Sequence, residues 1–321
     1  MLKVRQDSCK PEMKDVMAEM FYKSMNRRSF IKTSLAVCGS LITIGAGNSF
    51  GSSKKANRET RWAFLADTHI PAVDDSNNPP EGHYCYNPHG NLRKVVSEVH
   101  SASPDGVAIT GDLARLMGKL DDYAALKRLL NPIAKKRPVL MALGNHDDRG
   151  NFLKVFDETA AGKQRVANKY VIVVERPPVR LIILDSLFYV NKVPGLLGQA
   201  QRRWLEDYLK KCDDTPTILC VHHTLGDSDG CLLDVPRLYR IIKPIRKVKA
   251  IVYGHSHTYG FSEFEGIHLV NVPATGYSFN NNVPVGWVEA QLTAKGGDFT
   301  LHVVGGNKEK DGSLKRLKWR I

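Results

Sequence analysis

The amino-acid sequence predicts an α/β fold with buried, largely parallel sheets. Short apolar runs recur from residue 61 onward, and amphipathic helical patterns lie between them. Apolar runs of this kind are typical of strands that are covered on both faces. The strands predicted on this basis are Trp62–Ala66, Gly106–Thr110, Pro138–Leu143, Thr217–Val221 and Ala250–Tyr253.

The intervening helices are indicated by apolar residues at i, i+3, i+4 and i+7. Leu92, Val95, Val96 and Val99 have this spacing, and the segment Gln199–Lys211 repeats it. The sequence therefore places at least two amphipathic helices between the predicted parallel strands.

One further pair of strands is expected to be antiparallel. Val171–Glu175 and Leu181–Asp185 are separated by Arg176-Pro177-Pro178 and read as an antiparallel pair. After residue 258 strands dominate, and no linker interrupts the pattern, so we expect one domain over residues 59–321. The last predicted strands are Tyr259–Phe264, Ile267–Val272, Gly286–Leu292 and Phe299–Val304.

Residues 1–58 differ in composition from the rest of the 321-residue chain. They hold 11 of the 46 Lys and Arg and 4 of the 33 Asp and Glu, a net charge of +7 out of the total of +13. The remaining body has a net charge of +6, which suits anionic substrates but gives no strong sign of nucleic-acid binding. We therefore treat residues 1–58 as an N-terminal extension with its own role.

The extension has the three parts of an export signal. A basic segment, Asn26 to Lys32, precedes the apolar run Thr33 to Ile44, and small and polar residues follow. The pair Arg27-Arg28 closely resembles a twin-arginine signal. The resemblance implies the twin-arginine machinery as a partner, an exported and periplasmic bacterial protein, and membrane contact only through this segment. Two alternatives stay open: an N-terminal membrane anchor, although the run is shorter than the ~20 residues that span a bilayer, and a true start at Met25.

Polar side chains follow each of the five predicted parallel strands. Because ligands gather outside the carboxyl ends of strands in open α/β sheets, we expect these side chains to meet in one crevice. Imidazole and carboxylate groups together suit transition metals such as Zn, Fe, Mn or Co. The sequence therefore predicts a metal site. Its motifs are Asp67-Thr68-His69, Gly111-Asp112, Gly144-Asn145-His146-Asp147, His222-His223 and Gly254-His255-Ser256-His257.

This ordered set of motifs resembles that of the calcineurin-like metallophosphoesterases, and the resemblance covers Arg61 to about Val272. It implies a four-layer α/β/β/α sandwich with a dinuclear metal site at the carboxyl ends of the strands. The implied cofactors are two divalent or transition metal ions: Mn, Fe, Zn or Co. The implied residue roles are a first metal site of Asp67, His69 and His257, a bridging Asp112, and a second site of Asn145, His222 and His255.

The same resemblance implies that His146 is the catalytic imidazole. Asp147 is then a candidate to orient or polarise His146, and His223 a candidate to contact substrate or to support the ligands. Purple acid phosphatases carry a Tyr three residues after the bridging Asp, whereas this chain has Arg115, so a tyrosinate-bound ferric centre is not expected. Many phosphodiesterases of the family have two prolines after the His pair, and this chain has Thr224-Leu225.

The expected function is metal-dependent hydrolysis of a small phosphate ester by a metal-bridging hydroxide, with phosphodiesters favoured. Lys and Arg are absent within two residues of the five motifs, apart from Arg149. A diester carries one negative charge and needs fewer cationic side chains than a monoester. The alternatives are a phosphomonoesterase with the same site, a nuclease, and a non-catalytic partner-binding module.

Overall fold

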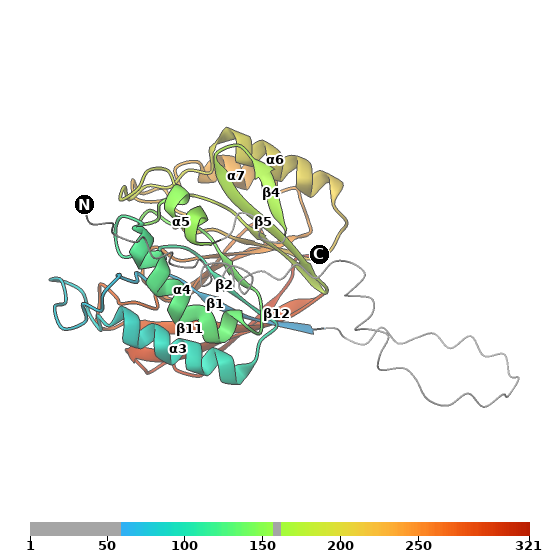
Figure 1. The fold of residues 1–321 in the computed structure, drawn as a ribbon. Helices are drawn as coiled ribbons and strands as arrows, with labels where there is room; N and C mark the ends of the chain where they lie inside the picture. Colours follow the sequence, from blue (N-terminus) through green and yellow to red (C-terminus); the bar gives the residue numbers. More distant parts are fainter. Residues whose placement is uncertain (1–58, 157–161) are drawn as a thin grey trace, which may run out of the picture.

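The computed structural model describes residues 59–156 and 162–321, which form two β-sheets that face each other and are covered by helices on their outer sides (Figure 1). This is the α/β/β/α arrangement that the sequence predicts. The predicted export signal lies outside the described residues. Within the described ranges, no helix combines the length and the apolar character that crossing a membrane requires.

The first sheet has the strand order β13-β12-β11-β1-β2-β3. Its strands β1, β2 and β3 are parallel, as predicted, and the C-terminal strands β11, β12 and β13 are antiparallel additions. The bounds are β1 (Glu59–Leu65), β2 (Gly106–Ile109), β3 (Val139–Met141), β11 (Pro284–Thr293), β12 (Gly296–Gly306) and β13 (Leu314–Lys318).

The second sheet has the order β4-β5-β6-β7-β8-β10-β9. Strands β6, β7, β8 and β10 are parallel, whereas β5 pairs antiparallel with β6, as predicted from the intervening prolines. The bounds are β4 (Lys163–Val166), β5 (Lys169–Arg176), β6 (Val179–Ile183), β7 (Thr217–Cys220), β8 (Val248–Tyr253), β9 (Gly260–Phe264) and β10 (Ile267–Asn271).

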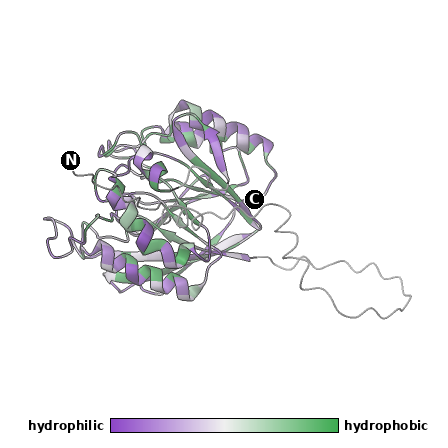
Figure 2. Ribbon diagram, in the orientation of Figure 1, coloured by the Kyte–Doolittle hydropathy of each residue, from purple (hydrophilic) through white to green (hydrophobic). Residues whose placement is uncertain are grey.

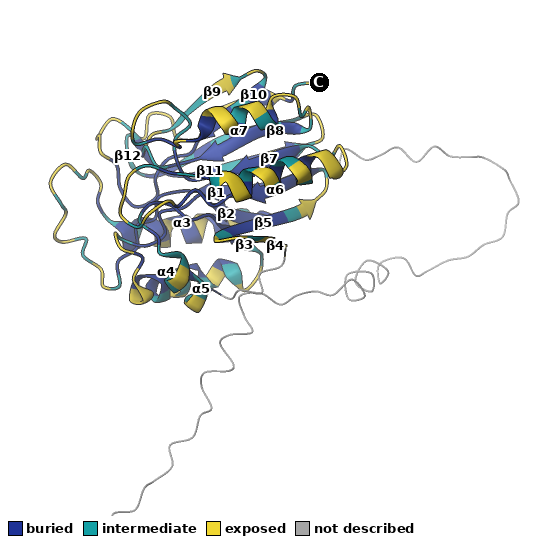
Figure 3. Ribbon diagram, turned by 90° about the horizontal axis from the view of Figure 1, so that it is seen from above, coloured by how far each residue is buried: buried dark blue, intermediate teal, exposed yellow. Residues whose placement is uncertain are grey.

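Helices cover both outer faces, with their polar residues turned to solvent (Figures 2 and 3). Helices α3 and α4 lie on the first sheet, α5 packs against α4, and α6 and α7 lie on the second sheet. The side chain of Asn87 caps α3 by accepting a hydrogen bond from the Gly90 amide, and Pro88 occupies the first turn. The bounds are α3 (Pro88–Ala102), α4 (Leu120–Ala134), α5 (Arg149–Val155), α6 (Gly198–Lys211) and α7 (Val235–Ile242).

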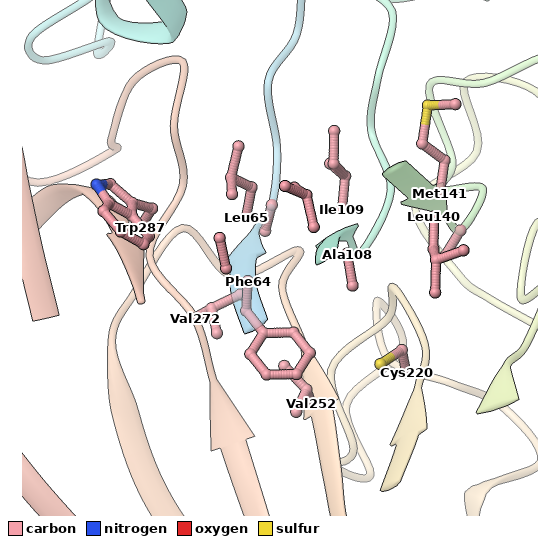
Figure 4. Packing of buried hydrophobic residues seen from close by; sticks show 14 of the residues in the cluster. Phe64, Leu65, Ala108, Ile109, Leu140, Met141, Cys220, Val252, Val272 and Trp287 are labelled. Atoms are coloured by element: carbon pink, nitrogen blue, oxygen red, sulfur yellow. The ribbon is translucent and has the colours of Figure 1, made fainter. Parts of the chain in front are cut away.

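Alternating side chains of the strands fill two apolar layers. Along β6, Leu181 and Ile183 face the space between the sheets, whereas Ile182 packs under α6 and α7. In Figure 4, Phe64 of β1 points toward Val252 of the second sheet. Burial of the central strands fixes their register. The fixed register in turn fixes the positions of the strand ends that carry the predicted ligands.

The cysteines of the described residues form no disulfide. Cys220 is fully buried in the layer between the sheets. Cys85, Cys212 and Cys231 are also free thiols.

Candidate metal centre

The five predicted motifs come together at the carboxyl ends of β1, β2, β3, β7 and β8. Backbone hydrogen bonds join neighbouring loops directly: the Asp67 amide donates to the Gly111 carbonyl at 3.0 Å, and the Gly254 amide donates to the His222 carbonyl at 3.0 Å. These bonds join loops within each sheet, and the His255 amide connects the two sheets by donating to the Asp67 Oδ2 atom at 3.0 Å.

Five of the predicted ligands have a left-handed backbone conformation, which is uncommon outside glycine and tends to occur at functional sites. It bends the chain as each strand ends and turns the side chain into the crevice between the sheets. These residues and their φ angles are Asp67 (52°), His69 (45°), Asp112 (49°), His255 (71°) and His257 (52°).

One group of ligand atoms comes from Asp67, His69 and His257. The Nε2 atoms of His69 and His257 are 3.1 Å apart, and the Asp67 Oδ1 atom is 3.5 Å from the His257 Nε2 atom. All three side chains are buried. This is the set that the sequence assigns to the first metal ion.

A second group lies beside the first. The His222 Nε2 atom is 3.2 Å from both the Asn145 Oδ1 atom and the His255 Nδ1 atom. The Asp112 Oδ2 atom is 3.3 Å from His222 Nε2 and 3.7 Å from His69 Nε2. A single carboxylate oxygen of Asp112 therefore stands between the two groups, where a bridging ligand belongs.

The hydrogen bonds of the imidazole rings show which ring nitrogens are free to bind a metal ion. The Nδ1 atom of His257 lies 2.9 Å from the Tyr277 carbonyl oxygen and that of His69 lies 3.4 Å from the Arg115 carbonyl oxygen. A carbonyl oxygen can only accept, so in the neutral rings both Nδ1 atoms carry the proton and both Nε2 atoms are unprotonated. Two such lone pairs 3.1 Å apart repel each other unless a cation lies between them.

The second group repeats this arrangement with one ring reversed. The Nδ1 atom of His222 faces the Thr110 carbonyl oxygen at 3.0 Å, and the Nε2 atom of His255 faces the Gly230 carbonyl oxygen at 3.0 Å. His222 therefore offers Nε2, and His255 offers Nδ1. Both donor sets fit a metal ion.

In the absence of metal, electrostatics favours the protonation states that metal binding needs at four of the predicted ligands, and His222 is the exception. Burial lowers the pKa of His69 to about 3, and burial together with His222 lowers that of His255 to about 4. Burial raises the pKa of Asp67 and Asp112, but the surrounding imidazoles outweigh it and lower both. Burial lowers the pKa of His222, yet the carboxylate of Asp112 outweighs burial and raises the pKa to about 9.

Two glycines of the motifs are required by close approach to the carboxylates. A Cβ atom at Gly144 would lie 2.2 Å from Asp112 Oδ1, and one at Gly254 would lie 2.5 Å from Asp67 Oδ2. Larger residues would push these carboxylates out of position.

A model of the calcineurin-like phosphoesterase family matches residues 60–259, which is more than half of the chain. The chain belongs to this family. It is 31% identical over 248 residues to a probable cyclic nucleotide phosphodiesterase of Rhodococcus erythropolis, with 72% of this chain and 76% of that protein covered. It is 28% identical over 229 residues to another from Vesicomyosocius okutanii, with 70% and 89% covered.

A solved structure, a dimetal phosphatase from Danio rerio, superposes with a TM-score of 0.63 at 15% identity, covering 81% of this chain and 99% of that one. At this identity the likeness supports the fold alone. Family membership and the two converging ligand groups together make the chain a metallophosphoesterase, a hydrolase of phosphoric esters.

The predicted catalytic imidazole of this metallophosphoesterase stands at the edge of the two groups. His69, Asp112 and His146 each offer a ligand atom within 4.8 Å of one another. The His146 Nδ1 atom lies 3.0 Å from the Leu116 carbonyl oxygen, so Nδ1 donates to it and Nε2 faces away. The His146 ring is partly exposed, whereas the ligands around it are almost all buried.

The expected pairing of Asp147 with His146 is wrong. The Asp147 carboxylate is fully buried and accepts hydrogen bonds from the amides of Leu113, Ala114 and Gly144, and it also accepts one from the Tyr123 hydroxyl. The carboxylate points back into the loop that carries Asp112, because four donors converge there. Burial and the nearby Asp112 carboxylate raise its pKa to about 7. Its role is to hold the ligand loops together.

His223 adjoins the second ligand group, with a ring nitrogen within 4.8 Å of ring nitrogens of His222 and His255. It is fully buried, its Nδ1 atom is 2.7 Å from the Ser186 hydroxyl oxygen, and its ring centroid is 4.7 Å from that of His255. Burial favours the supporting role over contact with substrate, and both stay predictions.

The sequence analysis did not identify the aromatic residues that pack against the first ligand group. The Tyr277 ring lies 4.9 Å from that of His69, and the Phe279 ring lies 4.5 Å from that of His257. Both residues follow β10, and the parallel bridge between Ala66 and Ala274 brings this segment alongside the end of β1. In the sequence, these residues could have been found because they follow a predicted strand, as the ligands do, although they are aromatic and not metal-binding.

Proposed function

We propose that the chain is an exported phosphodiesterase that acts on small diesters, cyclic nucleotides among them, with two metal ions bound by the converging ligand groups. The observation that carries the proposal is the single Asp112 oxygen that stands between two complete sets of donor atoms. The named activity of the bacterial relatives supports the choice of diester. Imidazole with carboxylate suits Mn, Fe, Zn or Co as the metals.

The charged side chains nearest the site also favour a diester. Arg149, the one basic residue close to a motif in sequence, is bound bidentately to the buried Asp185 through contacts of 2.6 and 3.0 Å. Lys169 donates to the carbonyl oxygens of Leu187 and Leu196. These cations are held by the protein itself and are not free to neutralise the second charge of a monoester.

Arg115 and Arg320 are likewise engaged by the protein or distant from the predicted ligands. Arg115 lies 3.5 Å from the Asp75 carboxylate and over the ring of Tyr86. Arg320 in the basic C-terminal tail donates to the Val248 carbonyl, at the end of β8 opposite to the ligands. A monoanionic phosphodiester fits this cation-poor surrounding better than a dianion.

In this proposal the residues of the site bind the metal ions, and His146 transfers a proton. Bound metal ions would supply Lewis-acid stabilisation of the phosphate oxygens and a water of lowered pKa. Asp67, His69, Asp112, Asn145, His222, His255 and His257 hold those ions. The Leu116 carbonyl holds the Nδ1 proton of His146, so Nε2 is the atom that would pass a proton to the leaving oxygen, and it can do so only when the ring is in the doubly protonated imidazolium form.

The substrate preference is tested by comparing bis-p-nitrophenyl phosphate with p-nitrophenyl phosphate under identical metal and pH. We expect a higher kcat/KM for the diester, because the nearby cations are already neutralised by carboxylates or bound to carbonyls. The comparison is repeated for the Mn, Zn and Fe forms. A preference for the monoester in all three forms would reject the diesterase and favour a phosphatase.

Export is the part of the proposal supported by the residue pattern at Arg27-Arg28. Replacing both residues with Lys is expected to leave the protein in the cytoplasm, since the pair is the recognition element of a twin-arginine signal. Fractionation of cells into periplasm and cytoplasm measures this. A matched control replaces Arg5 and Arg58, outside the motif, with Lys. Equal periplasmic recovery of the Arg27→Lys, Arg28→Lys protein and the control would contradict the proposal.

A further inference from the structure

Aromatic rings line one side of the metal centre, next to the first ligand group. The Tyr277 ring packs against both His69 and His257. The His83 ring lies 4.4 Å from Tyr277 and 5.3 Å from Phe279. The rings come from two loops that are nearly 200 residues apart in the sequence and that meet only in the folded chain.

Backbone pairing holds these two loops together. Tyr84 and Ser278 form an isolated antiparallel bridge, with amide-to-carbonyl distances of 2.8 and 3.0 Å. The amide of Gly276 donates to the carbonyl of the ligand Asp67 at 2.9 Å. The backbone next to Phe279 is thereby fixed relative to the first ligand group, and the Phe279 ring lies 4.5 Å from the His257 ring.

Phe279 differs from its aromatic neighbours in its exposure. Tyr277 is 2% exposed, so its ring serves as packing, whereas Phe279 is 53% exposed although it touches the ring of a metal ligand. Exposing a large apolar ring costs free energy that burial would recover. Exposed aromatic faces of this kind are used by proteins to stack planar groups, and nucleobases stack on them with little regard to base identity.

We propose that Phe279 stacks against a planar aromatic substituent of the phosphodiester, a nucleobase or an aryl group, and so selects substrates that carry one. The inference rests on the proposed function, and it goes further by naming the residue that recognises the non-reacting part of the substrate. His83 and Tyr84 flank this stacking position, and the metal ligand His257 lies beneath it.

The test compares two diesters with the same leaving group: phenyl p-nitrophenyl phosphate and ethyl p-nitrophenyl phosphate. A third substrate, 3′,5′-cyclic AMP, distinguishes a nucleobase from a simple aryl ring. Phe279→Ala is expected to lower kcat/KM about 10-fold for the phenyl ester and for cyclic AMP, the size of one stacking interaction, and to leave the ethyl ester within about 2-fold. Loss with only one of the two aromatic substrates would assign the subsite to that one.

Two further variants separate stacking from apolar contact. Phe279→Tyr keeps the ring and is expected to behave as wild type, whereas Phe279→Leu keeps apolar volume and is expected to behave as Phe279→Ala. The control Leu314→Ala removes another exposed apolar side chain on the distant edge strand β13 and should change nothing. Metal content is measured for each variant, because Phe279 contacts the ligand His257.

The outcomes distinguish this inference from the function on which it rests. Equal losses for the phenyl and ethyl esters, a wild-type Phe279→Leu protein, or loss of metal in Phe279→Ala would overturn the stacking role and leave the phosphodiesterase standing. A wild-type protein that hydrolyses none of the diesters would overturn both.

Discussion

Replacing Asp112 with alanine is expected to abolish both metal occupancy and turnover. The Asp112 Oδ2 atom lies 3.7 Å from His69 Nε2 and 3.3 Å from His222 Nε2, so one substitution removes a ligand from each group. The fall in kcat should be at least about 10³-fold, since even one electrostatic contact to a developing charge is worth nearly that much. Diester hydrolysis and metal analysis of the purified protein measure both effects.

A matched control shows that these losses are local. Asp214 is an almost fully exposed aspartate that pairs with Lys247 at the surface, and Asp214→Ala should keep full activity and metal. Circular dichroism confirms that Asp112→Ala still folds. A folded Asp112→Ala protein that binds metal as wild type does would refute the bridging assignment.

Replacing His146 with alanine is expected to remove chemistry while sparing the metal ions. The ring is anchored through Nδ1 to the Leu116 carbonyl, and its partial exposure suits a group that exchanges protons with substrate. Loss of a positioned acid–base group typically costs ~10²–10⁴-fold in rate. The measurement is kcat for a diester together with metal content, and added imidazole should restore part of the rate.

The position of His146 also allows a different role, that of a metal ligand. His146 offers a ligand atom within 4.8 Å of those of His69 and Asp112, so it is close enough to be tested as a ligand. Loss of a metal ion from His146→Ala, with no rescue by imidazole, would make it a ligand. His100→Ala, at a partly exposed position in the last turn of α3, is the control for loss of an imidazole elsewhere.

The central strands and the ligand positions could be predicted from the sequence. A strand that is buried on both faces consists of a continuous run of apolar residues, and such a run is easily recognised. Strands β1, β2, β3, β7 and β8 all overlap the predicted runs, and each is followed by its predicted ligand motif. The register of a buried strand is strongly specified, so the position of the residue just after it is predictable as well.

Two of the four edge strands, β4 and β13, could not be predicted in this way. β4 is Lys-Gln-Arg-Val and β13 is Leu-Lys-Arg-Leu-Lys, and each lies at the edge of its sheet. Edge strands are often charged, which prevents pairing with other chains but removes the apolar pattern. Helix α4 has Pro132 near its C-terminal end, a residue that argues against a helix when the sequence is read alone.

Contacts between loops that are distant in the sequence could not be predicted from the sequence either. Asp147 adjoins His146 in sequence, yet its carboxylate accepts from the amides of Leu113 and Ala114 in another loop. Phe279 lies 22 residues after His257, and the bridges of Ala66 with Ala274 and of Tyr84 with Ser278 place it at the site. Sequence patterns identify which residues end a strand, but not which loops then meet.

The metal content of the wild-type protein, measured by inductively coupled plasma mass spectrometry during titration of chelator-treated protein, tests the central claim most directly. Two ligand groups that share Asp112 predict two ions bound per chain, with diester hydrolysis appearing as they bind and absent from the metal-free protein. Full activity with no metal, or with a single ion per chain, would contradict the account.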